Sequence, residues 1–307
     1  MLKEEIIENL NNIVGEKNVH VDEPMSKHTT IRTGGNADYY VVPQSSNELI
    51  SIVTFSRNNN IDYYLFGNGS NTLVLDKGIR GIVISFSGLS DISCDEINNE
   101  IYVGAGFSTI KATIYAKNHN MTGLEFACGI PGTIGGGIFM NAGAYGGEFK
   151  DIVKEVKCYF IKENITKTLS NAECGFDYRK SVFQTLDDAI ILSCVLKLNK
   201  GNKEEIDKQM KENMASRSSK QPVRFPSAGS VFKREEGIVV AKLIDDAGLK
   251  GYKVGGAEVS NLHAGFIINT GNAKSQDVLD VIDHVKKVVL EKYNVTLHEE
   301  IKIIGEK

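Results

Sequence analysis

The stretch from Phe126 to Gly147 constrains the fold more than any other part of this sequence. It carries no charged residue, and eight of the nineteen residues from Gly129 to Gly147 are glycines. Glycine costs roughly 0.5 to 1 kcal/mol relative to alanine inside a regular helix or strand, so this composition is abnormal for either element. The embedded Ile130 and Ile134 need burial, which argues against a flexible linker. The run from Gly129 to Gly137 therefore predicts close approach of the backbone to a large, flat, phosphorylated ligand.

A second glycine-rich segment, Gly67-Asn68-Gly69-Ser70-Asn71, directly follows the apolar run from Tyr63 to Phe66. Small residues at such a place let backbone N–H groups turn inward and bind an anion, of which a diphosphate is an example. The segment differs from a dinucleotide fingerprint, because Thr72 replaces the third glycine and no long helix follows. A plain hairpin turn is the alternative interpretation.

Composition favours a folded enzyme with a small-molecule partner. The 307 residues are 41% hydrophobic and 24% charged, and a net charge of −4 gives no basic surface for nucleic acid or an anionic membrane. The most apolar segment, Ala189 to Leu198, contains Lys197 and is too short to span a bilayer. Acidic residues stand at the N-terminus where a secretory signal would be basic, so we expect a cytoplasmic protein. We also expect a monomer.

The five cysteines are odd in number and widely spaced, without a C-x-x-C pair. This spacing favours reduced thiols over a disulfide framework or a zinc cluster, so no metal site is predicted.

Hydrophobic periodicity and turn residues predict alternating helices and short strands. Helices are expected at 2–13, after a capping box that begins at Ser45, and at 108–118, 204–214, 238–247 and 278–289. Strands are expected at 37–42, 63–66, 72–75, 81–86, 101–103, 153–160, 189–198, 263–269 and 301–304. The helix at 204–214 leads toward a predicted domain boundary near Ser216, and the last strand is free to return to either part of the chain.

Seven motifs, in this order, resemble those of UDP-N-acetylenolpyruvoylglucosamine reductases, and together they span nearly the whole chain. They are Thr33-Gly34-Gly35-Asn36-Ala37, Gly67-Asn68-Gly69-Ser70-Asn71, Gly123 to Gly132, Met140-Asn141-Ala142-Gly143-Ala144-Tyr145-Gly146, Tyr178-Arg179-Lys180-Ser181, Ala228-Gly229-Ser230-Val231-Phe232 and Glu300-Ile301. The segment from Tyr178 to Leu198 leaves no room for the long tyrosine-bearing loop of one branch, so the chain resembles the shorter branch.

The resemblance implies an α+β protein that holds FAD without a covalent bond and takes hydride from NADPH. A two-lobed FAD-binding domain of the vanillyl-alcohol-oxidase type is expected at 1–215, with lobes of about 1–65 and 66–215. A substrate-binding domain at 216–299 and a final strand at 300–307 follow. The residues assigned to FAD are Gly67, Asn68, Gly69, Ser70, Asn71, Gly129, Ile130, Gly132, Thr133, Gly135, Gly136, Asn141, Ala142 and Gly143.

Three catalytic positions follow from the resemblance: Ser230 as proton donor, with Arg179 and Glu300 as the other active-site residues. Each has an ordinary alternative, namely a turn or helix-capping serine, a surface ion-pair partner and a solvated charge at a strand edge. Tyr178, Lys220 and Arg234 are expected to contact the substrate.

Two further features of the second half of the chain bear on this assignment. His263 enters an apolar strand and is given no role. Family members often have proline soon after the Gly-Ser-x-Phe motif, whereas Arg234-Glu235-Glu236-Gly237 follows it in this chain.

The reaction implied is reduction of the enolpyruvyl group of UDP-N-acetylglucosamine enolpyruvate, a step in the synthesis of bacterial cell-wall precursor. A flavin oxidase or dehydrogenase of the same fold acting on alcohols or hydroxy acids is the first alternative. A non-catalytic nucleotide-sugar binding protein, or a flavoprotein regulator, is the second. Reduction of the bound flavin by NADPH and its reoxidation by the enolpyruvyl substrate separate the three.

Overall fold

The computed structural model describes residues 1–234 and 237–307, so Glu235 and Glu236 lie outside the described residues. The chain forms two compact units that alternate along the sequence. The first comprises Met1–Val19, Val41–Asn68 and Ile84–Ser216, and the second comprises His20–Tyr40, Gly69–Val83 and Arg217–Lys307. Both contain helices and strands, which confirms the predicted α+β class. The three-part domain division stays a prediction.

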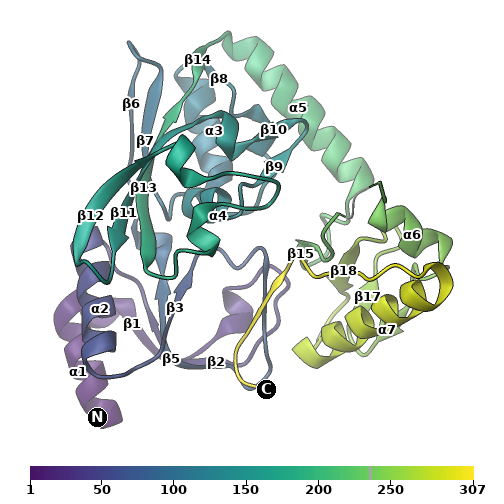
Figure 1. Cartoon of the computed structure of the whole chain (residues 1–307), viewed down its shortest axis with the longest axis horizontal. Coiled ribbons are helices and arrows are strands. Elements are labelled where there is room, and N and C mark those ends of the chain that lie inside the picture. The colour runs from purple at the N-terminus through teal and green to yellow at the C-terminus, as the bar shows by residue number, and fades with distance from the viewer. Residues whose placement is uncertain (235–236) are drawn as a thin grey trace. The chain divides into compact units, whose positions relative to one another are not determined.

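A five-stranded antiparallel sheet is the framework of the first unit, in the order β12-β11-β13-β7-β6 (Figure 1). Its strands are β6 (Ile92–Asp95), β7 (Glu100–Gly104), β11 (Val153–Phe160), β12 (Ile165–Ser170) and β13 (Ala189–Lys197). β11 and β13 were expected from their β-branched runs, and both are confirmed to within a residue. Two short ribbons join β8 (Met121–Thr122) to β14 (Asn199–Lys200) and β9 (Gly143–Ala144) to β10 (Gly147–Glu148).

The helices of the first unit begin where their capping residues predict. Ser45 accepts a hydrogen bond from the Glu48 N–H at 3.2 Å and caps α2 (Ser46–Asn58), and Ser108 caps α3 (Thr109–Asn118) in the same way. The other elements are α1 (Lys3–Val14), β3 (Tyr63–Phe66), α4 (Ile134–Phe139) and most of α5 (Lys203–Lys220). α5 runs well beyond the predicted end at Met214.

Helix α4 corrects the sequence interpretation of the glycine-rich stretch, which was considered unsuited to a helix. Thr133 caps α4 by accepting the Gly136 N–H, and glycines within it are required by packing. A Cβ on Gly137 would lie 2.4 Å from the ring of Phe149, which is fully buried. The helical cost of glycine is therefore offset by contacts that no larger residue permits.

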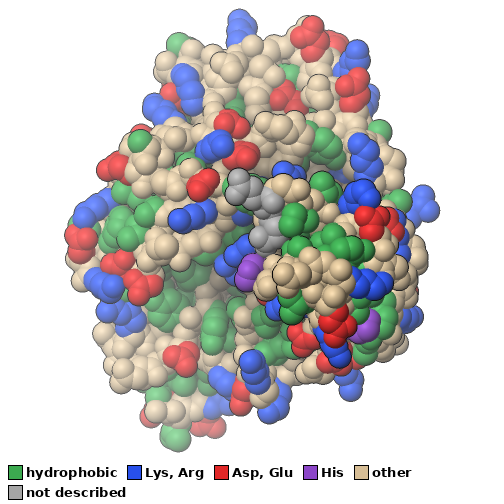
Figure 2. All heavy atoms as spheres, turned by 45° about the vertical axis from the view of Figure 1, so that its right-hand side comes forward, with side chains coloured by type: hydrophobic (Ala, Val, Ile, Leu, Met, Phe, Trp, Pro, Cys, Tyr) green, Lys and Arg blue, Asp and Glu red, His purple; other side chains and the backbone are tan. Residues whose placement is uncertain are grey.

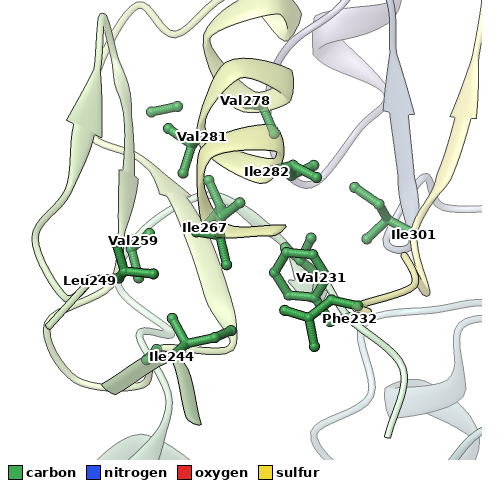
Figure 3. Close-up of a cluster of buried hydrophobic side chains, with 14 of the residues drawn as sticks. Val231, Phe232, Ile244, Leu249, Val259, Ile267, Val278, Val281, Ile282 and Ile301 are labelled. Carbon is green, nitrogen blue, oxygen red and sulfur yellow. The ribbon is translucent and has the colours of Figure 1, made fainter. Parts of the chain in front are cut away.

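The second unit contains an antiparallel sheet in the order β15-β18-β17-β16, and helix α7 contributes a row of valines and Ile282 to its core (Figure 3). Its elements are β15 (Ser227–Ser230), α6 (Val240–Asp246), β16 (Lys253–Val254), β17 (Ala257–Val259), β18 (Phe266–Asn269) and α7 (Ser275–Tyr293). The unit also holds β4 (Thr72–Val74) and most of β1 (Val19–Pro24), β2 (Asn36–Val41) and β5 (Ile79–Ser85). Strand β18 is shorter than predicted, because His263 to Gly265 form a turn.

The position of the C-terminal strand, which the sequence left open, is settled by pairing. β19 (Lys302–Ile304) pairs in parallel with β4, with Ile303 opposite Leu73. Leu73 and Ile301 are buried in the same core as Val231 and Ile267. The tail therefore belongs to the second unit, and the same hydrophobic core fixes the residues that flank it.

No helix of the described residues is both long enough and apolar enough to cross a membrane. On the face shown in Figure 2, basic and acidic side chains are interspersed.

Candidate active site

The two glycine-rich segments meet in the first unit, although 63 residues separate the contacting positions. Asn68 Nδ2 donates a hydrogen bond to the Pro131 carbonyl at 2.6 Å. A Cβ at Gly67 would lie 3.0 Å from Thr133 Oγ1, so a side chain there would press on the second segment. The glycine at position 67 is thus needed for the close approach of two loops, as well as for any ligand.

The second glycine-rich loop runs along the beginning of α3. The Thr109 N–H donates to the Gly132 carbonyl at 3.0 Å, and Ser108 bridges to Thr133. The Thr109 hydroxyl oxygen is buried and has no hydrogen-bond partner within the described residues. An unsatisfied buried hydroxyl costs roughly 1 to 3 kcal/mol, so a polar ligand or water is expected to bond to it. No role was predicted for Thr109, which lies within the helix predicted at 108–118.

Gly135 and Gly136, assigned to the cofactor from the sequence, have internal contacts that explain them. The Gly135 N–H donates to the Ala105 carbonyl at 2.8 Å, and a Cβ on Gly135 would lie 2.8 Å from the Ala105 Cβ. The Gly136 N–H donates to Thr133 Oγ1 at 3.2 Å. These two N–H groups are therefore already bonded, which leaves the loop before Thr133 as the better candidate for ligand contact.

Asn141 fixes the segment that carries Arg179. It is fully buried, with Nδ2 donating to Glu148 Oε2 at 2.8 Å and to the Asp177 carbonyl at 2.9 Å, while Oδ1 accepts the Lys150 N–H at 2.9 Å. Its side chain is thus fully used inside the protein. The side chain of Asn141, which was predicted to bind FAD, is therefore occupied by contacts within the protein.

The Arg179 guanidinium lies against the same loop. It donates to the Gly143 carbonyl at 3.0 Å and to the Asn141 carbonyl at 3.4 Å. Arg179 also has a φ of +52°, a conformation that is uncommon outside glycine and marks a constrained site. Gln184 reinforces the turn by donating to the Arg179 carbonyl at 2.9 Å. Carbonyl oxygens of the neighbouring loop therefore hold the Arg179 guanidinium.

The chain passes from the first unit to the second within the pentapeptide, between Asn68 and Gly69. In the second unit, Thr30 holds the Gly69 end, because its N–H donates to the Gly69 carbonyl at 3.2 Å and its hydroxyl donates to the Ser227 carbonyl at 2.7 Å. Asn71 Nδ2 donates to the Glu300 carbonyl at 3.2 Å. The loop is thereby fastened to the strand of Ser230 and to the backbone of Glu300.

Ser230 and Glu300 are brought together from positions seventy residues apart. Ser230 ends β15, and the next residue, Val231, accepts the Glu300 N–H at its carbonyl at 2.7 Å. Val231 and Ile301 are buried in the core of the second unit, 1% and 4% exposed, where Figure 3 shows them with Phe232. Ser230 and Glu300 are thus each followed directly by a buried hydrophobic residue. Ser230 is neither in a helix cap nor in a hairpin turn.

His263, for which no role was predicted, lies near Ser230. A Cβ on Gly265 would be 3.0 Å from His263 Cε1 and 3.4 Å from Ser230 Oγ. The Gly265 N–H donates to His263 Nδ1 at 3.1 Å, which leaves the proton of the neutral ring on Nε2. Burial, aided by the charge of Lys250, lowers the pKa of His263 and favours that neutral form.

Comparison with known proteins decides the family. A model of the C-terminal domain of UDP-N-acetylenolpyruvoylglucosamine reductase matches residues 221–304, and a model of an FAD-binding domain matches residues 37–168. The UDP-N-acetylenolpyruvoylglucosamine reductase of Caldanaerobacter subterraneus subsp. tengcongensis is 47% identical over the full length of both chains. The chain belongs to the UDP-N-acetylenolpyruvoylglucosamine reductase family.

Other relatives of this reductase family agree. The Staphylococcus haemolyticus reductase is 43% identical over all of this chain and 99% of its own. The crystal structure of the Thermus caldophilus reductase aligns with a TM-score of 0.78 at 33% identity, covering 94% of this chain and 98% of that one. The predicted family, the flavin-binding fold with a C-terminal α+β part, and FAD as cofactor are confirmed.

The remaining residues assigned to this reductase's substrate lie on exposed segments. Tyr178 is 39% exposed, and the Arg179 guanidinium carbon lies 5.2 Å from its ring centroid. Lys220 ends α5, and Arg234 follows Phe232 after one residue. A cavity of about 550 Å³ in the first unit is lined by Gln44, Tyr102 and Thr168 among others, and by none of the predicted site residues.

Proposed function

We propose that this chain catalyses the NADPH-dependent reduction of UDP-N-acetylglucosamine enolpyruvate to UDP-N-acetylmuramate, with FAD bound non-covalently, as a cytoplasmic monomer. The observation that carries the proposal is the pairing of Ser230 and Glu300 through the Glu300 N–H and the Val231 carbonyl, at 2.7 Å. The full-length relatives that bear the reductase name support the choice of substrate. Light scattering of the purified protein tests the monomer.

The residues present fit an FAD cofactor. Two glycine-rich loops in contact, the absence of charge from Phe126 to Gly147, and the Thr109 hydroxyl, which has no partner among the described residues, suit a flat ligand with polar edges. Within the first unit, Gly67, Asn68 and residues 129–133 would hold it. Bound FAD supplies hydride, taken from NADPH, to the methylene carbon of the enolpyruvyl group.

The protein's own residues then handle the negative charge and the proton. Hydride addition leaves negative charge on the carbon next to the substrate carboxylate, and a fixed cation stabilises it. Arg179 suits this task, because carbonyl acceptors hold its guanidinium and it does not lose its proton. Ser230 Oγ donates the proton to that carbon. Glu300 fixes the arrangement through its position beside Val231.

Replacement of Ser230 tests the proposal. Ser230→Ala should leave the reduction of FAD by NADPH near the normal rate, because the glycine-rich loops are untouched. Reoxidation by the enolpyruvyl substrate should slow by about 10² to 10⁴, the usual loss for a general acid. Ser230→Cys keeps a transferable proton and should restore part of the rate. Anaerobic stopped-flow absorbance of the flavin measures both half-reactions.

Ser227→Ala, three residues earlier on the same strand, is the matched control and should leave both half-reactions intact. A substrate-driven rate in Ser230→Ala within a few-fold of the parent would remove Ser230 from the mechanism. Reduction of the oxidised flavin by simple alcohols or hydroxy acids, with no reoxidation of the reduced flavin by the enolpyruvyl substrate, would favour the oxidase alternative.

A further inference from the structure

Three potential metal ligands meet in the first unit, on a part of the molecule that the proposed reaction does not use. Cys94 is the second-last residue of β6, and Glu96 lies in the turn that follows this strand. His119 is the C-cap residue of α3. The Cys94 Sγ, a Glu96 carboxylate oxygen and a His119 ring nitrogen all lie within 4.8 Å of one another. We propose that Cys94, Glu96 and His119 form a binding site for a divalent transition-metal ion, with Zn²⁺ the best fit.

The distances suit a tetrahedral ion after one small movement. Ligand atoms at the usual Zn–S and Zn–N bond lengths stand about 3.3 to 3.8 Å apart. Cys94 Sγ and His119 Nδ1 are already 3.4 Å apart. His119 Nδ1 and Glu96 Oε1 are 2.7 Å apart, the length of a hydrogen bond, and must separate by roughly 0.6 Å. The Glu96 side chain is 67% exposed, so this movement displaces no packed neighbour.

The donor set selects the metal. A thiolate with an imidazole prefers zinc or another borderline-soft cation, whereas magnesium and calcium prefer oxygen ligands alone. Three protein ligands leave a fourth position for water. The site also lies at the C-terminal end of the ten-residue helix α3, where the helix carbonyls favour positive charge.

Tyr115 provides the outer support that metal sites commonly have. It lies one turn before His119, with ring centroids 4.5 Å apart, and its hydroxyl hydrogen-bonds with Cys94. Such outer-shell partners orient the ligands and tune the bound metal. The sequence showed no metal signature, because His119 is 25 residues from Cys94 and the pair has no zinc-finger spacing.

The other cysteines provide an internal contrast. All five lie in the described part of the chain, and Cys94 is the one that is not buried. Burial raises the pKa of Cys158 to about 12 and that of Cys174 to about 11, so these sulfurs remain thiols. A bound ion would join the β6–β7 turn to the end of α3 and should raise the unfolding temperature of the protein.

Equilibrium dialysis of the FAD-loaded protein against micromolar zinc, with metal measured by mass spectrometry, tests the site. About one zinc per chain should bind. Cys94→Ser and His119→Gln should each weaken binding at least tenfold, and Tyr115→Phe by about 10- to 100-fold, the usual effect of an outer-shell change. Zinc should also slow alkylation of Cys94 by iodoacetamide, as peptide mapping reports.

Matched controls are Cys128→Ser, which removes a thiol elsewhere, and Glu163→Gln, which removes an exposed carboxylate from another turn. Both should bind zinc like the parent, and Cys94→Ser should keep its flavin content and reductase activity. Equal zinc binding by the parent and Cys94→Ser, or alkylation of Cys94 at the same rate with and without zinc, would overturn the proposal.

Discussion

Replacing Asn141 by alanine should lower both stability and turnover, because this side chain holds the Arg179 segment. The variant loses two hydrogen bonds to backbone groups and one to the Glu148 carboxylate. Bonds to neutral partners contribute about 0.5 to 1.5 kcal/mol each and a charged one about 1.5 to 3 kcal/mol. Since the three share one buried residue, they are not additive, and we expect a loss of about 3 to 4 kcal/mol of unfolding free energy.

The effect on turnover follows from the freed loop. Without Asn141, the Asp177 carbonyl keeps the Lys180 N–H as a donor but loses its tie to the Asn141 loop, and the turn that carries Arg179 can move. Misplacement of a catalytic group by about 1 Å costs on the order of 10² in rate, so kcat should fall about 100-fold while FAD remains bound. Urea unfolding measures the stability, and anaerobic stopped-flow measures the substrate half-reaction.

Two further variants make the test specific. Asn171→Ala removes two bonds from the same region, to the Lys150 and Val153 carbonyls, without touching the Arg179 turn. It should lose about 1 to 3 kcal/mol of stability and keep its kcat. Asn141→Asp retains the acceptor for Lys150 but cannot donate to Asp177, so it should share the kinetic defect. A weakened FAD affinity in Asn141→Asp with unchanged kcat at saturating FAD would refute this reasoning and favour direct cofactor contact.

Other outcomes follow from packing and charge. Gly135→Val should reduce folded protein as well as FAD content, since even a Cβ would meet Ala105 at 2.8 Å, and circular dichroism with flavin absorbance checks both. Burial lowers the pKa of His263, so the stabilisation by the neutral ring is complete above its ordinary pKa near 6.5 and is lost as pH falls. The parent should therefore lose more unfolding free energy between pH 7 and pH 5 than His263→Gln does, as urea unfolding measures. Hydrogen bonds with Lys117 and a second lysine lower the pKa of Asp207 to about 2, so Lys117→Met should lessen the stability lost between pH 4 and 2.

Local sequence patterns were enough for the elements that rest on local physics. Ser45 capped its helix as predicted, because a capping serine bonds to an N–H only a few residues away. The helix predicted from Ser108 also formed, with Ser108 as its cap. The β11 strand matched its predicted bounds, since its valines and aromatic residues lie close together in the sequence. The seven motifs likewise identified the family before any contact was known.

Contacts between distant residues decided the rest. Asn141 was predicted to bind the cofactor, but its buried amide bonds to groups up to 36 residues away, and no local pattern encodes such a partner. Helix α4 contains glycines at Gly135 and Gly137 because Ala105 and Phe149 lie too close to these positions to allow a Cβ. Sequence composition alone did not show these contacts. Periodicity and turn chemistry therefore specified which segments fold and which carry the site. Hydrogen bonds and packing across the tertiary structure determined what each polar side chain is left free to do.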